Sequence, residues 1–245
     1  MAIHYLNCFS CSARVPAHWH TGTMCLVVDT DQGPVLVDTG LGEQDYLRPP
    51  AILRVFQAIT IVPLDPDEAA VRQLARLGYR RGDVRHIVLT HMHFDHCGGL
   101  PDFPEATVHV HRREHEAFFG RRCHWTELAY VRRHGAHHPH WALYQESGER
   151  WFDFEAIRLP FEPEMWMVPL HGHSRGHCGI AIRDGEGWLF HVGDSAAVEF
   201  SPEAPEWLVR LVLGPHQPRL RRFGGAHPEV RMTTGHMWLS FFGKP

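Results

Sequence analysis

Short apolar runs separated by turn residues dominate both ends of the chain. The clearest pair, residues 24–30 and 34–38, flanks a turn that contains Gly33, a pattern that predicts a β-hairpin. Residues 86–90 (HIVLT) have the continuous hydrophobic character of a buried strand. Further strand-like runs lie at 107–111, 188–194 and 229–236.

One segment, residues 65–78, has a helical pattern. Its apolar residues recur at helical spacing, at Val71, Leu74 and Leu77. Asp65 precedes Pro66 and suits the N-cap, Glu68 stands where a capping box places an acid, and Gly78 can end the helix. Strands interrupted by helices predict an α/β fold with more than one sheet. No repeat or low-complexity linker divides residues 1–245, so we predict a single domain.

The composition narrows the class of protein. Hydrophobic residues make up 44% and charged residues 21%, enough apolar material for a sizeable core. A net charge of -4 does not favour a nucleic-acid or anionic-membrane partner. No run of 18 apolar residues predicts a membrane span, and the first residues lack a signal-peptide pattern, so we expect a cytoplasmic protein. Its six cysteines should then be reduced, and Cys8-x-x-Cys11 is interpreted as two ordinary thiols.

Histidine is the outlier of the composition, with 22 residues. The stretch THMHFDHCGG, residues 90–99, gathers His91, His93, Asp95 and His96 directly after the predicted strand. Imidazole and carboxylate together suit zinc, iron or manganese. His91 and His93 can point the same way from an extended segment, while the later pair can address a second ion. The pattern predicts a metal site at a strand end.

Other candidate ligands follow other predicted strands. Each has a simpler interpretation as a turn, a helix cap or a buried histidine, and only their joint occurrence favours a metal site. They are Asp38 in VDTG, His171, His173 and His177 in HGHSRGHCG, Asp194 in VGDSA, and His236 in TTGHM.

These motifs, taken together, resemble those of the metallo-β-lactamase-fold superfamily over nearly the whole chain. The resemblance implies a four-layer αββα sandwich of two mixed β-sheets flanked by helices, with metals at one edge of the sheets. It also implies that one ion is held by His91, His93 and His173, a second by Asp95, His96 and His236, with Asp194 bridging them and Asp38 supporting the ligand loops. His227 in GAHPE competes with His236 for the last position, and His177 is interpreted as structural.

The implied reaction is hydrolysis. Two divalent ions, zinc first and iron or manganese as alternatives, would share a bridging hydroxide that attacks the carbonyl of a small ester, lactone or thioester. Asp95 would be the catalytic residue that carries a proton to the leaving group. The layout is most similar to N-acyl-homoserine lactonases and glyoxalase-II-like members. Those lactonases carry a tyrosine three residues after the bridging aspartate, where this chain has Ala197.

Two alternatives belong to other functional classes. The same scaffold also serves iron-dependent oxidoreductases of sulfur compounds, and a non-catalytic metal-binding protein is the third option. The partner is expected to be a small molecule, and the oligomeric state, a homodimer included, stays open. Residues 121–145 are interpreted either as an amphipathic helix or as a substrate lid that carries Trp125, Tyr130 and Trp141.

Overall fold

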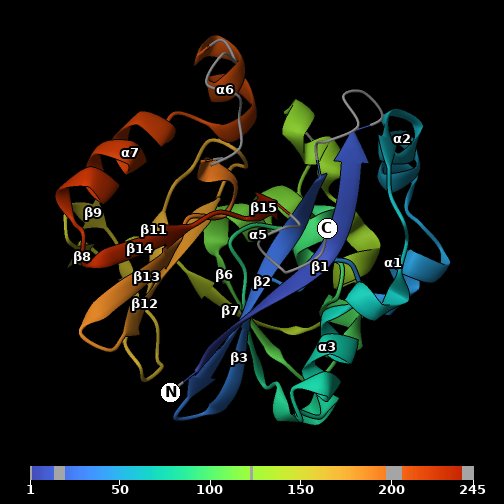
Figure 1. The fold of residues 1–245 in the computed structure, drawn as a ribbon, viewed down its shortest axis with the longest axis horizontal. Coiled ribbons are helices and arrows are strands. Elements are labelled where there is room, and N and C mark those ends of the chain that lie inside the picture. Colours follow the sequence, from blue (N-terminus) through green and yellow to red (C-terminus); the bar gives the residue numbers. More distant parts are fainter. Residues whose placement is uncertain (1, 14–19, 122–123, 197–205, 239–245) are drawn as a thin grey trace.

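The computed structural model describes residues 2–13, 20–121, 124–196 and 206–238. Two β-sheets lie face to face in the middle, with helices on the outer side of each (Figure 1). This is the αββα sandwich that the sequence predicts.

Among the described residues, the first sheet has eight strands in the order β4-β1-β2-β3-β5-β6-β7, with β15 paired to β2. The strands β1, β2 and β3 are antiparallel, whereas β3, β5, β6 and β7 are parallel. Their bounds are β1 Ile3–Ala13, β2 His20–Thr30, β3 Gly33–Val37, β4 Thr60–Ile61, β5 His86–Val88, β6 Thr107–His111, β7 His140–Tyr144 and β15 His236–Trp238.

The second sheet has five strands within the described part of the chain, in the order β10-β11-β12-β13-β14. All neighbours are antiparallel except β13 and β14. Their bounds are β10 Ile157–Arg158, β11 Met165–Pro169, β12 Cys178–Asp184, β13 Gly187–His191 and β14 Val230–Thr233, and a separate pair is formed by β8 Arg150–Trp151 and β9 Phe154–Glu155.

The helices flank the two sheets. Those that follow strands of the first sheet are α1 Glu43–Leu47, α2 Ala51–Ile59, α3 Ala70–Arg76, α4 Phe94–Cys97 and α5 Arg112–Phe119, and those near the second sheet are α6 Glu206–Leu213 and α7 Gln217–Ala226. Short 3₁₀ turns are η1 Pro66–Glu68, η2 Arg81–Asp83, η3 Leu100–Asp102, η4 Trp125–Ala129, η5 Arg132–Gly135 and η6 Gly193–Ser195.

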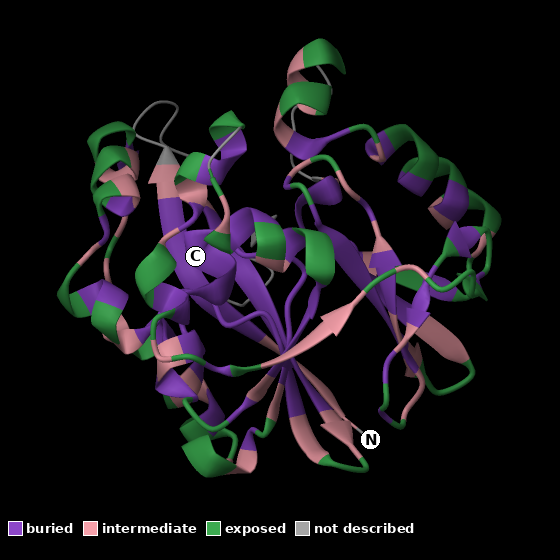
Figure 2. Ribbon diagram, turned by 180° about the vertical axis from the view of Figure 1, so that it is seen from behind, coloured by how far each residue is buried: buried purple, intermediate pink, exposed green. Residues whose placement is uncertain are grey.

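Buried side chains form separate apolar layers, and the strands lie in the buried interior of the molecule (Figure 2). Strand β2 of the hairpin shows how one strand contributes to two apolar layers. Leu26 packs between the two sheets, whereas its neighbour Val27 packs toward the helices, because successive strand side chains point to opposite faces. On the outer side of the second sheet, Phe223 of α7 packs against Phe190. Strands such as β2 are continuously hydrophobic because both of their faces are buried.

The strand predictions are confirmed with partly different bounds, except that residues 229–236 contain two strands, β14 and the start of β15, which belong to different sheets. The predicted helix over residues 65–78 is wrong at its start. Asp65 does cap through the backbone nitrogen of Asp67, but it caps only a 3₁₀ turn. The chain then leaves the helical conformation at Ala69 and resumes as α3. Glu68 is buried and accepts a hydrogen bond from the Ser10 hydroxyl on β1, so a tertiary contact replaces the expected capping box.

Of the two interpretations of residues 121–145, the amphipathic helix is also wrong. Residues 140–144 are strand β7, parallel to β6, and the preceding described residues contain the two 3₁₀ turns η4 and η5. Tyr130 is buried and Trp125 is half exposed, so these aromatics do not share one helical face.

The cysteines are buried free thiols at the five positions that the structure describes, Cys8 and Cys11 included. Burial raises the pKa of Cys11 to about 12, which leaves it unreactive at neutral pH.

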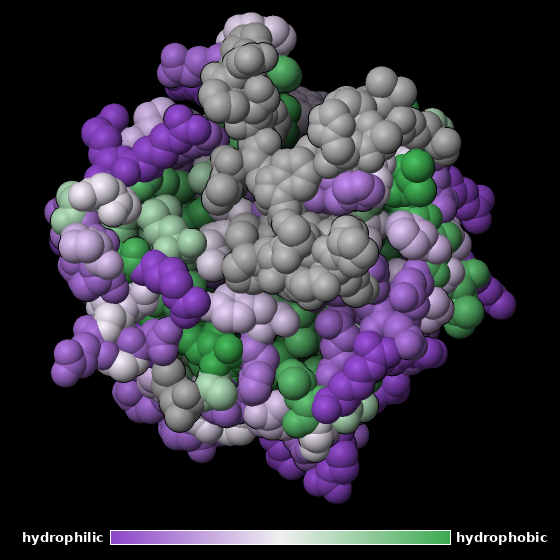
Figure 3. Space-filling view, in the orientation of Figure 1, coloured by the Kyte–Doolittle hydropathy of each residue, from purple (hydrophilic) through white to green (hydrophobic). Residues whose placement is uncertain are grey.

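None of the described helices has the length and apolar character needed to cross a bilayer. Hydrophilic and hydrophobic residues are interspersed over the face shown in Figure 3.

Candidate metal centre

The expected ligands follow strands that end at the same edge of the sandwich. Asp38 follows β3, and residues 90–97 follow β5, its parallel neighbour. The loop 170–177 joins β11 to β12, and Asp194 follows β13. Because β12 is antiparallel to both β11 and β13, its start lies beside the ends of those two strands. The topology therefore gathers segments distant in sequence.

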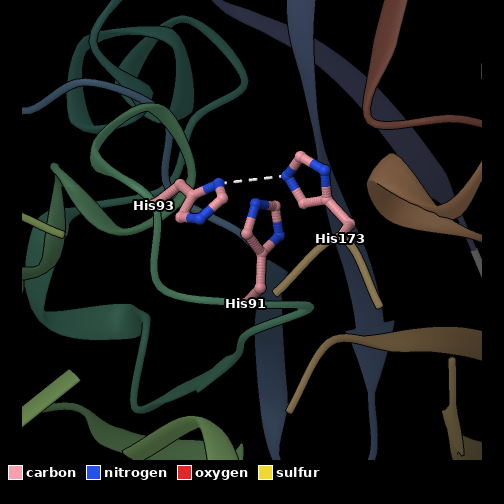
Figure 4. Close-up of side chains that lie close together, drawn as sticks. All are labelled: His91, His93 and His173. Atoms are coloured by element: carbon pink, nitrogen blue, oxygen red, sulfur yellow. Dashed lines mark hydrogen bonds between the residues drawn. The ribbon is translucent and has the colours of Figure 1, made fainter. Parts of the chain in front are cut away.

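The first group of donors is formed by His91, His93 and His173 (Figure 4). Nε2 of His173 lies 3.0 Å from Nδ1 of His93, and the His91 ring lies at a similar distance from both, with centroid separations of 4.5 Å to His93 and 4.9 Å to His173. The Nδ1 atom of His173 donates to the carbonyl of Val212 in α6, so its Nε2 carries a lone pair in the neutral ring.

The second group is formed by Asp95, His96 and His236. Oδ2 of Asp95 lies 3.4 Å from Nε2 of His236 and 3.8 Å from Nε2 of His96. His236 reaches this place because β15 pairs with β2, where it faces Thr23. The Thr23 hydroxyl donates to Asp95 at 3.3 Å. The competitor His227 lies elsewhere, packed against Phe223 and paired with Glu229.

Asp194 stands between the two groups. Its Oδ1 lies 3.5 Å from Nε2 of His96, and its Oδ2 lies 3.4 Å from Nε2 of His173 and 3.3 Å from Nε2 of His236. Donor atoms on one tetrahedral zinc ion are separated by about 3.4 Å, since each lies about 2.1 Å from the metal. The carboxylate therefore lies within ligand spacing of donors from both groups.

Several of the donor atoms also lack a hydrogen-bond partner among the described residues. Nε2 of His91, Nε2 of His96 and Oδ1 of Asp194 are buried and have no hydrogen-bond partner among the described residues. Leaving such atoms unsatisfied costs about 1–3 kcal/mol each, a cost that a bound cation would remove. Burial and the neighbouring imidazoles lower the pKa of His91 and His93 well below the usual value, so both are neutral at pH 7, as ligands must be.

The charged state of Asp194 also favours a metal site. Burial alone would raise the pKa of Asp194, but the adjacent His236 and His96 hold it well below the ordinary range of a carboxyl. The site thus contains an ionised Asp194 carboxylate enclosed by imidazoles, which fits a divalent cation.

Residues around this centre hold its loops. Asp38 accepts hydrogen bonds from the Thr90 backbone and hydroxyl and from His96, and it adopts a positive φ of 56°. His177, interpreted as structural, accepts from the backbone nitrogen of Asp194 at 3.0 Å and contacts the Ser195 hydroxyl.

Sequence reasoning missed Glu114 on α5. Its carboxylate is fully buried and accepts from the backbone nitrogens of Met92 and Gly176 and from the hydroxyls of Tyr130 and Ser174. It therefore ties the His91–His93 segment to the loop that carries His173. An acid in an amphipathic helix gives no local signal of such a role.

Comparisons with known proteins agree with this picture. The family described as Metallo-beta-lactamase superfamily matches residues 19–223. A Mycobacterium bovis protein named a probable metallo-hydrolase is 39% identical over 198 residues, which cover 79% of this chain and 62% of that protein. An N-acyl homoserine lactonase of Bacillus thuringiensis is 30% identical over 159 residues, 64% of this chain and 57% of that protein.

A solved structure shares the fold. It is a single-substitution variant of the B. thuringiensis protein AiiA with N-decanoyl-L-homoserine bound at its active site; it aligns with a TM-score of 0.71 and 18% identity over 99% of this chain and 96% of that one. The chain spans less than two thirds of the length of the curated relatives named above. The predicted resemblance is confirmed. From its motifs, its fold and the family match over most of its length, the chain belongs to the metallo-beta-lactamase superfamily.

Proposed function

We propose that this chain is a dinuclear-metal hydrolase that acts on the carbonyl group of a small lactone, ester or thioester. The observation that carries the proposal is the position of the Asp194 carboxylate between the two groups: its Oδ2 faces His173 of the first group and His236 of the second. One ion would be held by His91, His93 and His173, and the other by Asp95, His96 and His236. When bound, two divalent ions would supply Lewis-acid activation for the attack of water on a carbonyl.

Zinc is the proposed metal, because a mixed set of imidazole nitrogens and carboxylate oxygens at these spacings suits it. Iron and manganese accept the same donors. Metal identity is therefore part of the test.

Asp95 is the proposed proton carrier. It is nearly buried, lies at the side of the cluster, and has one oxygen oriented by the Thr23 hydroxyl. A carboxylate held there can take a proton from the attacking water and give it to the leaving oxygen or sulfur. No serine or cysteine nucleophile is needed, in keeping with the buried thiols of the described chain.

A lactone is the substrate class that the relatives favour, since one of them is named an N-acyl homoserine lactonase and AiiA holds N-decanoyl-L-homoserine. The position of the lactonase tyrosine, Ala197 here, lies outside the described residues. We propose that η4 and η5, rather than all of residues 121–145, border the substrate. Tyr130, which follows η4, lies 5.4 Å from His93 between ring centroids, and Trp125 at the start of η4 is half exposed.

The experiment combines metal analysis with a substrate panel. Purified protein should contain two divalent ions per chain and hydrolyse at least one compound from a set of N-acyl homoserine lactones, simple lactones and acyl thioesters. His227→Ala serves as a matched control, because that histidine lies away from the cluster. One iron per chain with oxygen uptake on a sulfur compound would favour the oxidoreductase alternative, and two ions without hydrolysis would favour a binding protein.

A further inference from the structure

A second cluster of histidine and carboxylate lies apart from the centre described above and shares no residue with it. His111 ends β6, Glu146 follows β7, and His171 follows β11. One donor atom from each lies within 4.8 Å of the others. The two imidazole rings have centroids 4.8 Å apart and are inclined by 63°.

The Glu146 carboxylate divides its two oxygens between the rings. Oε1 lies 3.2 Å from Nε2 of His171, and Oε2 lies 3.4 Å from Nε2 of His111. His111 is almost fully buried, whereas the Glu146 side chain is 31% exposed and the His171 side chain 20% exposed. The cluster is therefore closed on one side and open to water on the other.

Hydrogen bonds on the far side of His171 orient it for ligation. Its Nδ1 donates to the backbone carbonyl of His177 at 3.1 Å. In the neutral ring, Nε2 then carries a lone pair that faces the carboxylate. The lone pairs of Nε2 of His171 and of the Glu146 oxygen repel each other unless a proton or a metal ion lies between them.

His111 adds an unsatisfied atom. Its Nε2 is buried and has no hydrogen-bond partner among the described residues, like the donor atoms of the main centre. Burial and the neighbouring His171 lower the pKa of His111 to about 4, so the ring is neutral at pH 7. Its Nδ1 accepts from the Arg113 backbone nitrogen at 3.2 Å. A metal on Nε2 moves the proton to Nδ1 and costs this bond, which makes the site weaker than the main centre.

We propose that His111, Glu146 and His171 form an additional binding site for a zinc-type divalent ion. Two imidazoles select zinc and similar transition ions over magnesium and calcium, which prefer oxygen ligands. Three protein donors leave the fourth position to water on the open side.

The ion would connect the two sheets. His111 and Glu146 follow strands of the first sheet, and His171 follows a strand of the second. Binding therefore holds the loop of residues 170–177 against the ends of β6 and β7, and it should stabilise the folded chain.

The test is a zinc titration of the protein as purified with its resident ions. Wild-type protein is expected to bind one further Zn²⁺ per chain beyond its resident content, with a rise in melting temperature. Glu146→Gln keeps the shape but removes the charge, and it should weaken that additional ion at least tenfold. His227→Gln is the matched control, because His227 pairs with Glu229 and belongs to none of the donor groups found among the described residues.

Equal zinc binding by wild type and Glu146→Gln would overturn the proposal. So would a fall of the same size in His227→Gln. The measured quantity is the difference in bound zinc between wild type and Glu146→Gln. The number of ions in the main centre and the hydrolytic activity do not enter this comparison, so failure of the proposed function and failure of this site are distinguishable.

Discussion

Oδ2 of Asp38 accepts a hydrogen bond from Nδ1 of His96 at 2.8 Å, and neither side chain is exposed to solvent. This bond keeps the ring proton on Nδ1 and leaves Nε2 of His96 free to face Asp95 and Asp194. The pair therefore links the end of β3 to the candidate metal centre.

Asp38→Asn should weaken metal binding by about 10–100-fold. Asparagine fits the positive φ of this position, but its NH₂ group would face the Nδ1 proton of His96 and favour the wrong tautomer. Competition with a chromogenic chelator measures the affinity. Asp153→Asn, an exposed substitution, is the control. An unchanged affinity would remove Asp38 from the support of the centre.

Asp95→Asn should lower turnover by on the order of a hundredfold or more, the scale for losing a positioned proton carrier. Three histidines of the first group remain, so we expect that ion to stay bound. Turnover is normalised to metal content measured on the same sample. Wild-type turnover per ion would show that Asp95 carries no proton in the reaction.

His236→Ala should deplete the second ion and abolish hydrolysis, because its Nε2 faces both Asp95 and Asp194. His227→Ala should leave both nearly intact, since that side chain packs against Phe223 away from the cluster. Metal content and hydrolysis rate are compared in the two variants. The opposite pattern contradicts the assignment of the last ligand.

Glu114→Gln should reduce the free energy of unfolding by about 2–4 kcal/mol. Each carboxylate oxygen accepts two hydrogen bonds, and an amide would turn an NH₂ group toward two of the donors. Denaturant unfolding measures the change. The matched control is Glu116→Gln, on the exposed side of the same helix. Equal stabilities of the two variants would contradict the prediction.

Asp102→Asn should remove a pH dependence of stability. Burial raises the pKa of Asp102 to about 6 from 3.8, so the folded state keeps its proton at pH values where the unfolded state has lost it. The wild-type free energy of unfolding therefore falls as pH rises from about 4 to 6, by about 3 kcal/mol in total, and stays lowered above that range.

Urea unfolding of Asp102→Asn and wild type at several pH values between 4 and 7 checks this. The variant should gain stability relative to wild type as the pH rises through the window. A difference that is the same at every pH would contradict the raised pKa.

The local sequence determined most strands and the part of the candidate site where several ligands lie in one short segment. His91, His93, Asp95 and His96 follow a buried strand within six positions, so their chemistry and their placement at a sheet edge are properties of one short segment. The hairpin of residues 24–30 and 34–38 was predictable for the same reason. Its turn and its apolar runs are neighbours in the chain.

Tertiary structure alone decided what depends on distant partners. Glu68 left its expected capping role because Ser10 of β1 offers it a buried hydrogen bond. Residues 140–144 became a strand because β6 has a free parallel edge for them, which outweighs a helical pattern of polar and apolar residues.

Contacts between distant segments also decide which histidines reach the candidate metal centre. His236 and His227 have similar local surroundings in the sequence, and the pairing of β15 with β2 brings only the first to Asp194. Glu146 and His171 are 25 positions apart, and their meeting with His111 depends on how the two sheets stack. Spacing along the chain predicts which side chains can bind a metal, but the packing of one sheet on the other determines which of them share it.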